Sequence, residues 1–123
     1  MTDKRVVLVT CSSAKEARKI GRTMVEMRLA ACANIVSAPV QSTYRWKGKI
    51  EEAREYLLVL KTTTRRFGQL REAVLKLHSY DLPEIIALPI VEGARAYLQW
   101  IDDCTTLAKS KKRGSKRARR TPL

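Results

Sequence analysis

The pattern of apolar and polar positions in the first half of the chain predicts a strand, a helix and a long β-hairpin. Residues 6–9 (VVLV) form a run typical of strands that are buried on both faces. Ser13 and Glu16 have the spacing of a helical capping box. The apolar stripe of the helix that follows is predicted to consist of Ala17, Ile20, Met24 and Met27. Apolar and polar residues then alternate over residues 40–46, and the Lys-Gly pair at 47–48 predicts a tight turn into a returning strand.

The second half of the chain predicts two more helices and one more strand. The returning strand runs through residues 56–60 to Lys61, and the hydroxyl side chains at 62–64 are typical helix caps. The buried stripe of the second helix is predicted to be Phe67, Leu70, Val74 and Leu77. Residues 85–91 predict another strand, in which Pro89 indicates a sheet edge or a bulge. The inward-facing residues of a last helix are predicted to be Tyr97, Leu98 and Ile101.

The predicted order of elements is strand, helix, strand, strand, helix, strand, helix (βαββαβα). This is the split βαβ arrangement of an α+β, ferredoxin-like sandwich, extended by one C-terminal helix. Right-handed crossovers place the first two helices on one face of a four-stranded antiparallel sheet. Because this fold carries many unrelated functions, function has to be argued from particular residues.

Charge divides the chain into two parts. The 25 Lys and Arg residues exceed the 12 Asp and Glu residues, for a net charge of +13. All acidic residues lie between Asp3 and Asp103, whereas eight basic residues fall within 109–123. Residues 1–108 therefore carry +5 (17 basic, 12 acidic) and the tail carries +8. We predict one domain over residues 1–108 and a disordered basic tail over residues 109–123, since so few apolar residues cannot offset the entropy of ordering.

The cysteine and hydropathy patterns predict a cytoplasmic protein. The three cysteines, Cys11, Cys32 and Cys104, are odd in number and form no CxxC pair. This argues against a secreted disulfide framework and against a structural zinc site. No run approaches the roughly 18 apolar residues of a membrane span, and the first apolar stretch is too short for a signal peptide. We therefore expect free thiols and no membrane span.

Five blocks of the sequence closely resemble the CutA family of divalent-cation tolerance proteins. They are LAACANI at 29–35, YRWKGKIE at 44–51, LKTT at 60–63, LHSYDLPEI at 77–85 and YLQWI at 97–101. The resemblance covers about residues 5–104 and leaves the tail outside. It implies a ferredoxin-like protomer in a tight homotrimer, whose long hairpin reaches across to neighbouring subunits. It also implies a role in tolerance to copper and other divalent cations, without an established enzymatic activity.

The hairpin argues for self-association independently of the resemblance. Its strands run past the usual five or six residues and overhang a small sheet. An overhanging strand leaves its pairing edge and the rings of Tyr44 and Trp46 exposed unless a partner covers them. We interpret Tyr44 and Trp46 as anchors of an interface between copies of the chain.

His78 and Cys11 are the candidate metal ligands. His78 is the single histidine and ends the second predicted helix, while Cys11 ends the first strand. A neutral imidazole and a thiolate suit copper or zinc. The family's copper site uses a cysteine in the first strand and adjacent histidines at the end of the second helix. Val9 stands at that cysteine position and Leu77 at the first histidine position, so His78 alone matches, and a purely structural His78 is the alternative.

Lys61, Tyr80 and Glu84 are candidates for a ligand-binding site. Lys61 ends the third predicted strand, Tyr80 lies in the loop before the fourth, and Glu84 opens the fourth. The topology is expected to bring their three polar groups to one rim, and the resemblance implies that these positions line a cleft between subunits. One interpretation is a pocket for an anion or a metal ion. The other is an interface network in which Lys61 pairs with Glu84 and fixes the trimer register.

Two functions are compatible with these features. The main prediction is a homotrimer that binds copper or another divalent metal ion in the response to metal ions, with no enzymatic activity. The alternative is a trimeric signalling or scaffold protein, similar to the PII proteins, that binds a small anionic ligand in the intersubunit cleft. The chain has neither a nucleophile elbow nor a Gly-rich phosphate loop. The basic tail is either a nonspecific contact for nucleic acid or acidic lipid, or a solubilising extension.

Overall fold

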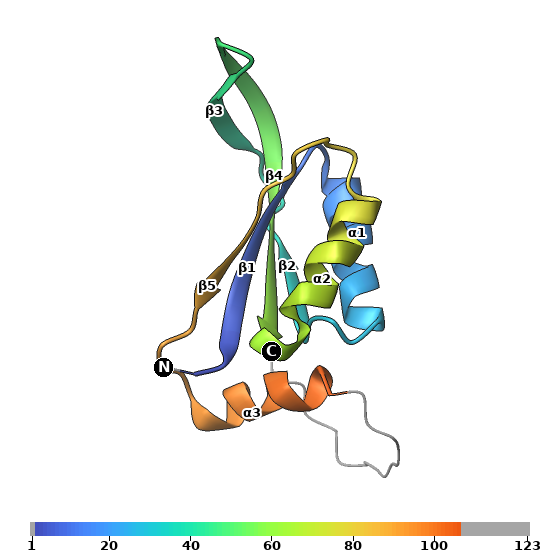
Figure 1. The fold of residues 1–123 in the computed structure, drawn as a ribbon, viewed down its shortest axis with the longest axis vertical. Coiled ribbons are helices and arrows are strands. Elements are labelled where there is room, and N and C mark those ends of the chain that lie inside the picture. The colour runs from blue at the N-terminus through green and yellow to red at the C-terminus, as the bar shows by residue number, and fades with distance from the viewer. Residues whose placement is uncertain (1, 107–123) are drawn as a thin grey trace.

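The structure is a computed structural model that describes residues 2–106 (Figure 1). Its elements are β1 (Lys4–Cys11), α1 (Ala14–Glu26), β2 (Cys32–Ile35), β3 (Val40–Trp46), β4 (Lys49–Thr63), α2 (Thr64–Leu77), β5 (Ile85–Pro89) and α3 (Arg95–Cys104). The predicted order is confirmed with one addition, the short strand β2. The predicted basic tail at 109–123 lies outside the described residues.

Strand β4 organises the sheet, because its 15 residues pair with three other strands. The strand order is β2-β4-β1-β5, and all pairings are antiparallel. Between Tyr56 and Thr63, β4 pairs with β1, while from Lys49 to Glu55 it pairs with β3. The β3–β4 hairpin therefore projects beyond the helices, as Figure 1 shows. This is the ferredoxin-like fold that the sequence predicted.

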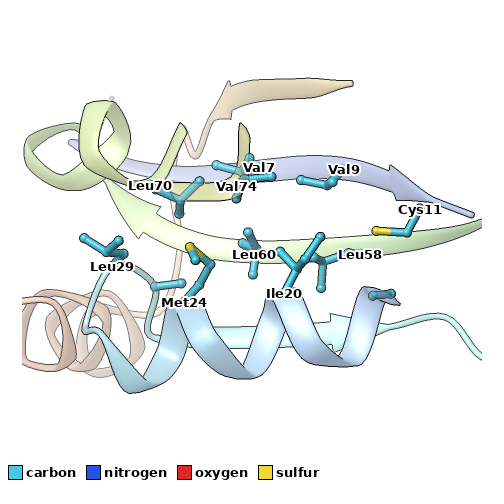
Figure 2. Packing of buried hydrophobic residues seen from close by; sticks show 12 residues of the cluster. Val7, Val9, Cys11, Ile20, Met24, Leu29, Leu58, Leu60, Leu70 and Val74 are labelled. Atoms are coloured by element: carbon cyan, nitrogen blue, oxygen red, sulfur yellow. The ribbon is translucent and has the colours of Figure 1, made fainter. Parts of the chain in front are cut away.

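Helices α1 and α2 cover one face of the sheet, and the core lies between these two layers (Figure 2). The fully buried side chains that fill it include Val7, Val9, Leu58, Leu60, Ile20, Met24, Leu70 and Val74. Burying a side chain of this size stabilises a fold by roughly 1.5–3 kcal/mol. Gly21 lets α1 approach the sheet, since a Cβ there would lie 2.9 Å from the Cβ of Ala33.

Three local predictions are wrong. Met27 and Leu77 were expected in buried stripes, but they are 51% and 37% exposed. Met27 is the C-cap of α1 and Leu77 is the last residue of α2, and helical spacing no longer directs a side chain to the sheet where the helix ends. The predicted hydroxyl cap of α2 also fails, because the N-cap Thr63 makes no side-chain hydrogen bond to the helix.

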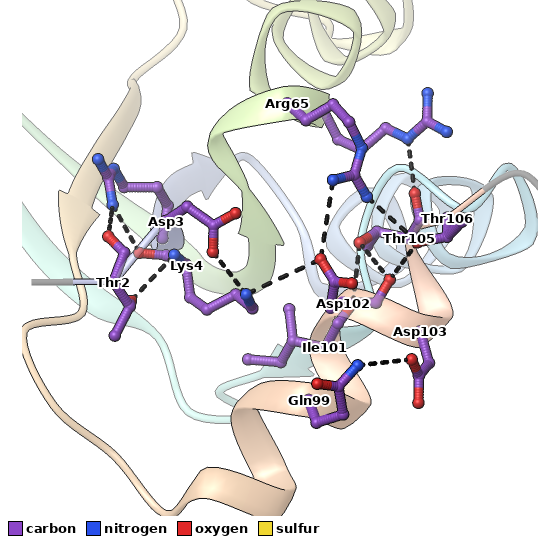
Figure 3. A network of polar contacts seen from close by, with 12 residues as sticks. Thr2, Asp3, Lys4, Arg65, Gln99, Ile101, Asp102, Asp103, Thr105 and Thr106 are labelled. Carbon is purple, nitrogen blue, oxygen red and sulfur yellow. Dashed lines mark hydrogen bonds and ion pairs between the residues drawn. The ribbon is translucent and has the colours of Figure 1, made fainter.

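Helix α3 closes the end of the sheet that lies opposite the hairpin (Figure 1). Ile101 is fully buried, as predicted, and Asp102 lies 3.8 Å from Lys4 Nζ and 3.7 Å from an Arg65 nitrogen (Figure 3). Arg66 Nε donates a 2.6 Å hydrogen bond to the Thr105 carbonyl. The chain therefore leaves the described region beside the first turn of α2.

The second face of the sheet keeps exposed apolar side chains. Leu8 pairs with Ile86 and Val6 pairs with Leu88, and these alternate with the core residues Val7 and Val9 on β1. Ile86 and Leu88 are 47% and 46% exposed. Strand β5 lies at the edge of the sheet, as Pro89 indicated. This face is an apolar surface of the kind that marks interaction sites.

Candidate functional site

Cys11, Glu16 and His78 lie together at the hairpin side of the core. Cys11 ends β1, Glu16 lies in the first turn of α1, and His78 is the C-cap of α2. The ligand atoms of the three side chains lie within 4.8 Å of one another. The structure thus brings the two predicted ligands together and adds a carboxylate to them.

The sequence identified Glu16 only as a capping residue. Ser13 Oγ does accept a 3.0 Å hydrogen bond from the Glu16 amide. The Glu16 carboxylate, however, accepts from the amide and hydroxyl of Ser12, each at 3.0 Å, and from the Ser79 amide at 2.8 Å. This last bond ties the start of α1 to the segment after α2. Because the partner is 63 residues away in the chain, local sequence patterns carry no sign of it.

Both ring nitrogens of His78 are engaged. Nε2 donates a 2.8 Å hydrogen bond to the Thr10 carbonyl, and Nδ1 accepts one of 3.1 Å from the Tyr80 amide. A carbonyl can only accept and an amide can only donate, so these partners select the neutral ring with its proton on Nε2. The His78 side chain is fully buried, and Glu16 Oε2 lies 3.7 Å from Nδ1.

The cluster combines one anion with two neutral groups. Burial, together with the nearby charges of Glu16 and Glu55, raises the pKa of the Cys11 thiol to about 12. Burial also opposes ionisation of Glu16, but hydrogen bonds from Ser12 and Ser79 outweigh it and hold the pKa of this carboxyl below its ordinary value. At neutral pH, Cys11 is therefore a thiol and Glu16 a carboxylate.

The three donors fit a borderline metal ion after a small contraction. Bonds of about 2.0–2.3 Å to sulfur, nitrogen and oxygen place the donors of a tetrahedral site roughly 3.3–3.7 Å apart. His78 Nδ1 and Glu16 Oε2, at 3.7 Å, already have such a separation, while the 4.8 Å limit for the cluster leaves about 1 Å to close. Sulfur, imidazole and carboxylate together suit copper or zinc. Three protein ligands leave one position open for water or another ligand.

Beside this cluster, a cavity of about 630 Å³ opens between β3 and the loop that follows α2. Its walls include three rings and three carboxylates, those of Tyr44, Trp46, Tyr80, Glu55, Asp81 and Glu84. Among the described residues, Arg45 is the one basic residue in its lining. We call this cavity the acidic pocket.

Tyr80 and Glu84, two predicted site residues, meet in the acidic pocket. The Tyr80 hydroxyl donates a 2.9 Å hydrogen bond to Glu55 Oε2. Burial and the Glu55 carboxylate raise the pKa of Tyr80, and the same two causes raise the pKa of Glu84. Within residues 2–106, the three carboxylates outnumber the basic residue Arg45 in the lining, so this part of the chain gives the pocket a net negative charge.

Lys61 lies elsewhere, so the expectation that it meets Tyr80 and Glu84 at one rim is wrong within a single chain. Its ammonium donates to Asn34 Oδ1, and in the sheet register it pairs with residues of β1 and β2. Six residues of strand, about 20 Å, separate it from Glu55. The physical reason is the length of β4, since the loop after α2 returns to the sheet near the middle of this strand and not near its end.

The fold and the cluster define a class, a small ferredoxin-like protein with a projecting hairpin and a set of metal-donor atoms at the base of that hairpin. Comparison with known families is consistent with this class, because the family described as CutA1 divalent ion tolerance protein matches residues 5–104. The chain therefore belongs to the CutA1 divalent ion tolerance family.

Individual relatives agree with this assignment. The divalent-cation tolerance protein CutA of Thermus thermophilus is 51% identical over 102 residues, covering 83% of this chain and 98% of the relative. The protein of the same name from Archaeoglobus fulgidus is 40% identical over 97 residues, covering 79% of this chain and 93% of the relative.

Solved structures give the same result. The divalent cation tolerance protein (Cut A1) of T. thermophilus matches with a TM-score of 0.81 at 50% identity, over 84% of this chain and 99% of that one. CutA from Xylella fastidiosa matches with a TM-score of 0.82 at 36% identity, over 85% and 100% of the two chains. Within residues 2–106, none of the helices has the length and apolar character needed to cross a membrane.

Proposed function

We propose that this chain acts in the response to metal ions by binding a divalent copper or zinc ion through Cys11, Glu16 and His78, and that it is a binding protein and not an enzyme. The observation that carries the proposal is the convergence of three different donor atoms within 4.8 Å at the ends of three elements. Family membership and the names of the relatives support a role connected with divalent cations.

Each residue has a defined task in this proposal. Cys11 loses its proton on binding and supplies a thiolate, so binding releases a proton to solvent. Glu16 supplies negative charge, and the Thr10 carbonyl keeps the His78 ring in place through Nε2. Nδ1 is then the donor, and it has to exchange the Tyr80 amide for the ion.

Titration of the full chain with Zn²⁺, followed by calorimetry in two buffers of different ionisation enthalpy, tests the proposal. We expect one ion per chain with release of about one proton. Cys11→Ser and Glu16→Gln should each weaken binding at least tenfold, whereas Glu72→Gln, at an exposed position of α2, should leave it unchanged. Stoichiometric binding that is unaffected by His78→Ala would remove this assignment, provided that circular dichroism shows the variant folded.

We also propose that the protein is a homotrimer. Support comes from the exposed apolar face formed by Ile86 and Leu88, which a monomer would leave in water. Tyr44 and Trp46 on the hairpin remain predicted interface anchors, although both rings line the acidic pocket in a single chain. Native mass spectrometry should show a mass three times that of the 14.0 kDa chain. A charge placed on this face, Ile86→Glu, should shift the protein to monomers, while Val91→Glu on the exposed segment after β5 should not.

The remaining expectations concern a small anionic ligand and the cellular location. A small anionic ligand, as in the PII-like alternative, is not favoured, because the carboxylates of the acidic pocket would repel it. A cytoplasmic location is supported by the free cysteines, two of which are buried. Alkylation of thiols in intact cells before lysis should find all three cysteines reduced.

A further inference from the structure

The acidic pocket contains negative charge that the described residues leave unbalanced. No Lys, Arg or His side chain within residues 2–106 forms an ion pair with Glu55, Asp81 or Glu84. Burial and the neighbouring charge of Glu55 raise the pKa of Glu84, one of these three carboxyls. A positively charged group would therefore bind here with a favourable electrostatic energy.

The aromatic side chains that line the acidic pocket indicate which kind of positively charged group can bind there. Tyr44 and Trp46 are exposed and line the same pocket as the carboxylates. Guanidinium and ammonium groups stack on tyrosine and tryptophan faces and pair with carboxylates at the same time. The pocket thus fits the side chain of arginine or lysine, which carries an apolar stem behind its charge.

The chain has a source of such side chains beyond the described residues. Eight basic residues lie between 109 and 123, without one acidic residue among them. They form two groups of four. The proximal quartet is Lys109, Lys111, Lys112 and Arg113, and the distal quartet is Lys116, Arg117, Arg119 and Arg120.

Geometry separates the two quartets by their reach. The described chain ends beside the first turn of α2, where Arg65 donates to the Thr106 hydroxyl at 3.2 Å. From Thr63, at this end of β4, to Glu55 in the pocket is eight residues of strand, about 27 Å. A fully extended chain spans at most about 3.3–3.6 Å per residue, so the backbone reaches about 25 Å from Thr106 at Arg113 and about 35 Å at Lys116. The proximal quartet would therefore need a fully stretched chain to meet the pocket, whereas the distal quartet has slack.

We propose that the distal quartet binds in the acidic pocket of its own chain, with arginine or lysine side chains between the aromatic rings and the carboxylates. The interaction gives a defined role to the part of the sequence that lies outside the family match at residues 5–104. It uses none of the three metal donors, so the two proposals rest on different side chains.

Carbodiimide cross-linking of the full chain at low salt tests the proposal directly, since it joins carboxylates to lysine amines in contact. We expect mass spectrometry to find Lys116 joined to Asp81 or Glu84, with yields several-fold above those for Lys109, Lys111 and Lys112. The cross-links should disappear in about 1 M NaCl, where the Debye length is about 3 Å. Absence of Lys116 cross-links, or equal yields for the proximal lysines, would overturn the proposal.

Isotope labelling decides which chain supplies the quartet. A sample in which ¹⁴N and ¹⁵N chains have assembled together should give cross-linked peptides of a single label. Peptides of mixed label would show that a neighbouring copy provides the tail, and would overturn the assignment to the same chain.

Fluorescence of Trp46, in a Trp100→Phe background, provides a second test with matched variants. Raising the salt concentration should shift its emission in the parent and in the variant with the proximal quartet changed to Gln. The shift should be lost when the distal quartet is changed to Gln, and also in Asp81→Asn/Glu84→Gln, but not in the control Glu52→Gln/Glu92→Gln. Equal effects of the two quartets would show a general charge effect and contradict the proposal.

Discussion

Two polar regions lie side by side at the base of the hairpin, and they differ in how their charged and polar groups are partnered. In the Cys11–Glu16–His78 cluster, both nitrogens of the buried imidazole have partners and the carboxylate accepts three hydrogen bonds. In the acidic pocket, three carboxylates line a cavity, and Arg45 is the one basic residue that residues 2–106 contribute to the lining. The first region is internally satisfied, whereas the second is arranged to receive a positive group from elsewhere.

Tyr80 connects the two regions. Its amide donates to His78 Nδ1 and its hydroxyl donates to Glu55, while its ring lies 4.7 Å from the His78 ring. Thr10 has a similar position, because its carbonyl holds His78 and it also lines the pocket. A change in one region is therefore expected to reach the other through these two residues.

Removal of the imidazole should have the largest effect on stability. In His78→Ala, the Thr10 carbonyl and the Tyr80 amide lose their partners, and a buried ring leaves a cavity. An unsatisfied buried group costs about 1–3 kcal/mol, so we expect a total loss of roughly 2–4 kcal/mol in the free energy of unfolding.

Urea denaturation checks this value, with Lys76→Ala as the control on an exposed position of the same helical turn. A loss no larger than the roughly 0.5 kcal/mol of an ordinary surface substitution would show that the cluster is less satisfied than its geometry indicates.

Removal of one hydroxyl from the pocket should have a smaller effect. Tyr80→Phe deletes the hydrogen bond to Glu55, and we expect a loss of about 0.5–1.5 kcal/mol in the free energy of unfolding. Tyr44→Phe makes the same chemical change on another ring of the pocket, where no described hydrogen bond is lost. A double-mutant cycle with Glu55→Gln isolates the pairwise energy, and a coupling of zero would contradict the proposed link.

The two regions should also respond to acid with opposite signs. The pKa of Glu16 is lowered in the folded state, so its contribution to stability is present above the ordinary value of 4.5 and is lost as the pH falls through the folded pKa. The pKa of Glu84 is raised in the folded state, mainly by burial. Its ionisation therefore opposes folding, and this penalty grows as the pH rises from 4.5 through the folded pKa.

Free energies of unfolding between about pH 3 and pH 7 for single variants test these signs. Glu16→Gln should lower stability at neutral pH and reduce the loss of stability in acid. Glu84→Gln should raise stability at neutral pH and match the parent near the acid end. If both variants change the free energy of unfolding at neutral pH in the same direction, the contrast between the two regions is refuted.

The sequence predicted those parts of the site that depend on local patterns. Cys11 and His78 could be placed because each ends an element that hydrophobic spacing identifies. The second role of Glu16 depends on Ser79, which lies far along the chain, so no local pattern could show it. Within a single chain, Lys61 lies apart from Tyr80 because its position depends on the length and register of β4, and not on the order of elements. A meeting of these positions in a cleft between subunits stays a prediction.

Strand β2 was missed for a related reason. Its four residues, Cys32–Ile35, are too few to show a period, and Pro39, which cannot donate to a ladder, separates them from β3. The predicted hairpin therefore began at residue 40, and residues 32–35 were left without a predicted element. The pairing of both strands with β4, which only the fold reveals, makes the long β4 the common partner of the core sheet and the hairpin.

The basic tail is predicted to bind nucleic acid weakly, and this is the smallest of the expected effects. Eight closely spaced positive charges attract phosphates with an affinity that falls steeply with salt and is typically about 10⁻⁴–10⁻⁶ M. If the distal quartet is engaged by the acidic pocket, the proximal quartet is the free one. Changing the proximal quartet to Gln should then weaken binding to duplex DNA at low salt more than the same change in the distal quartet.

Fluorescence anisotropy with labelled DNA at several salt concentrations measures this difference. A chain that ends at Ala108 sets the baseline, and equal binding by it and by the full chain would exclude the tail as a nucleic-acid contact. Asp81→Asn/Glu84→Gln should strengthen binding, because it releases the distal quartet while leaving the tail sequence unchanged. If both quartets contribute equally to DNA binding, the acidic pocket does not hold the distal quartet.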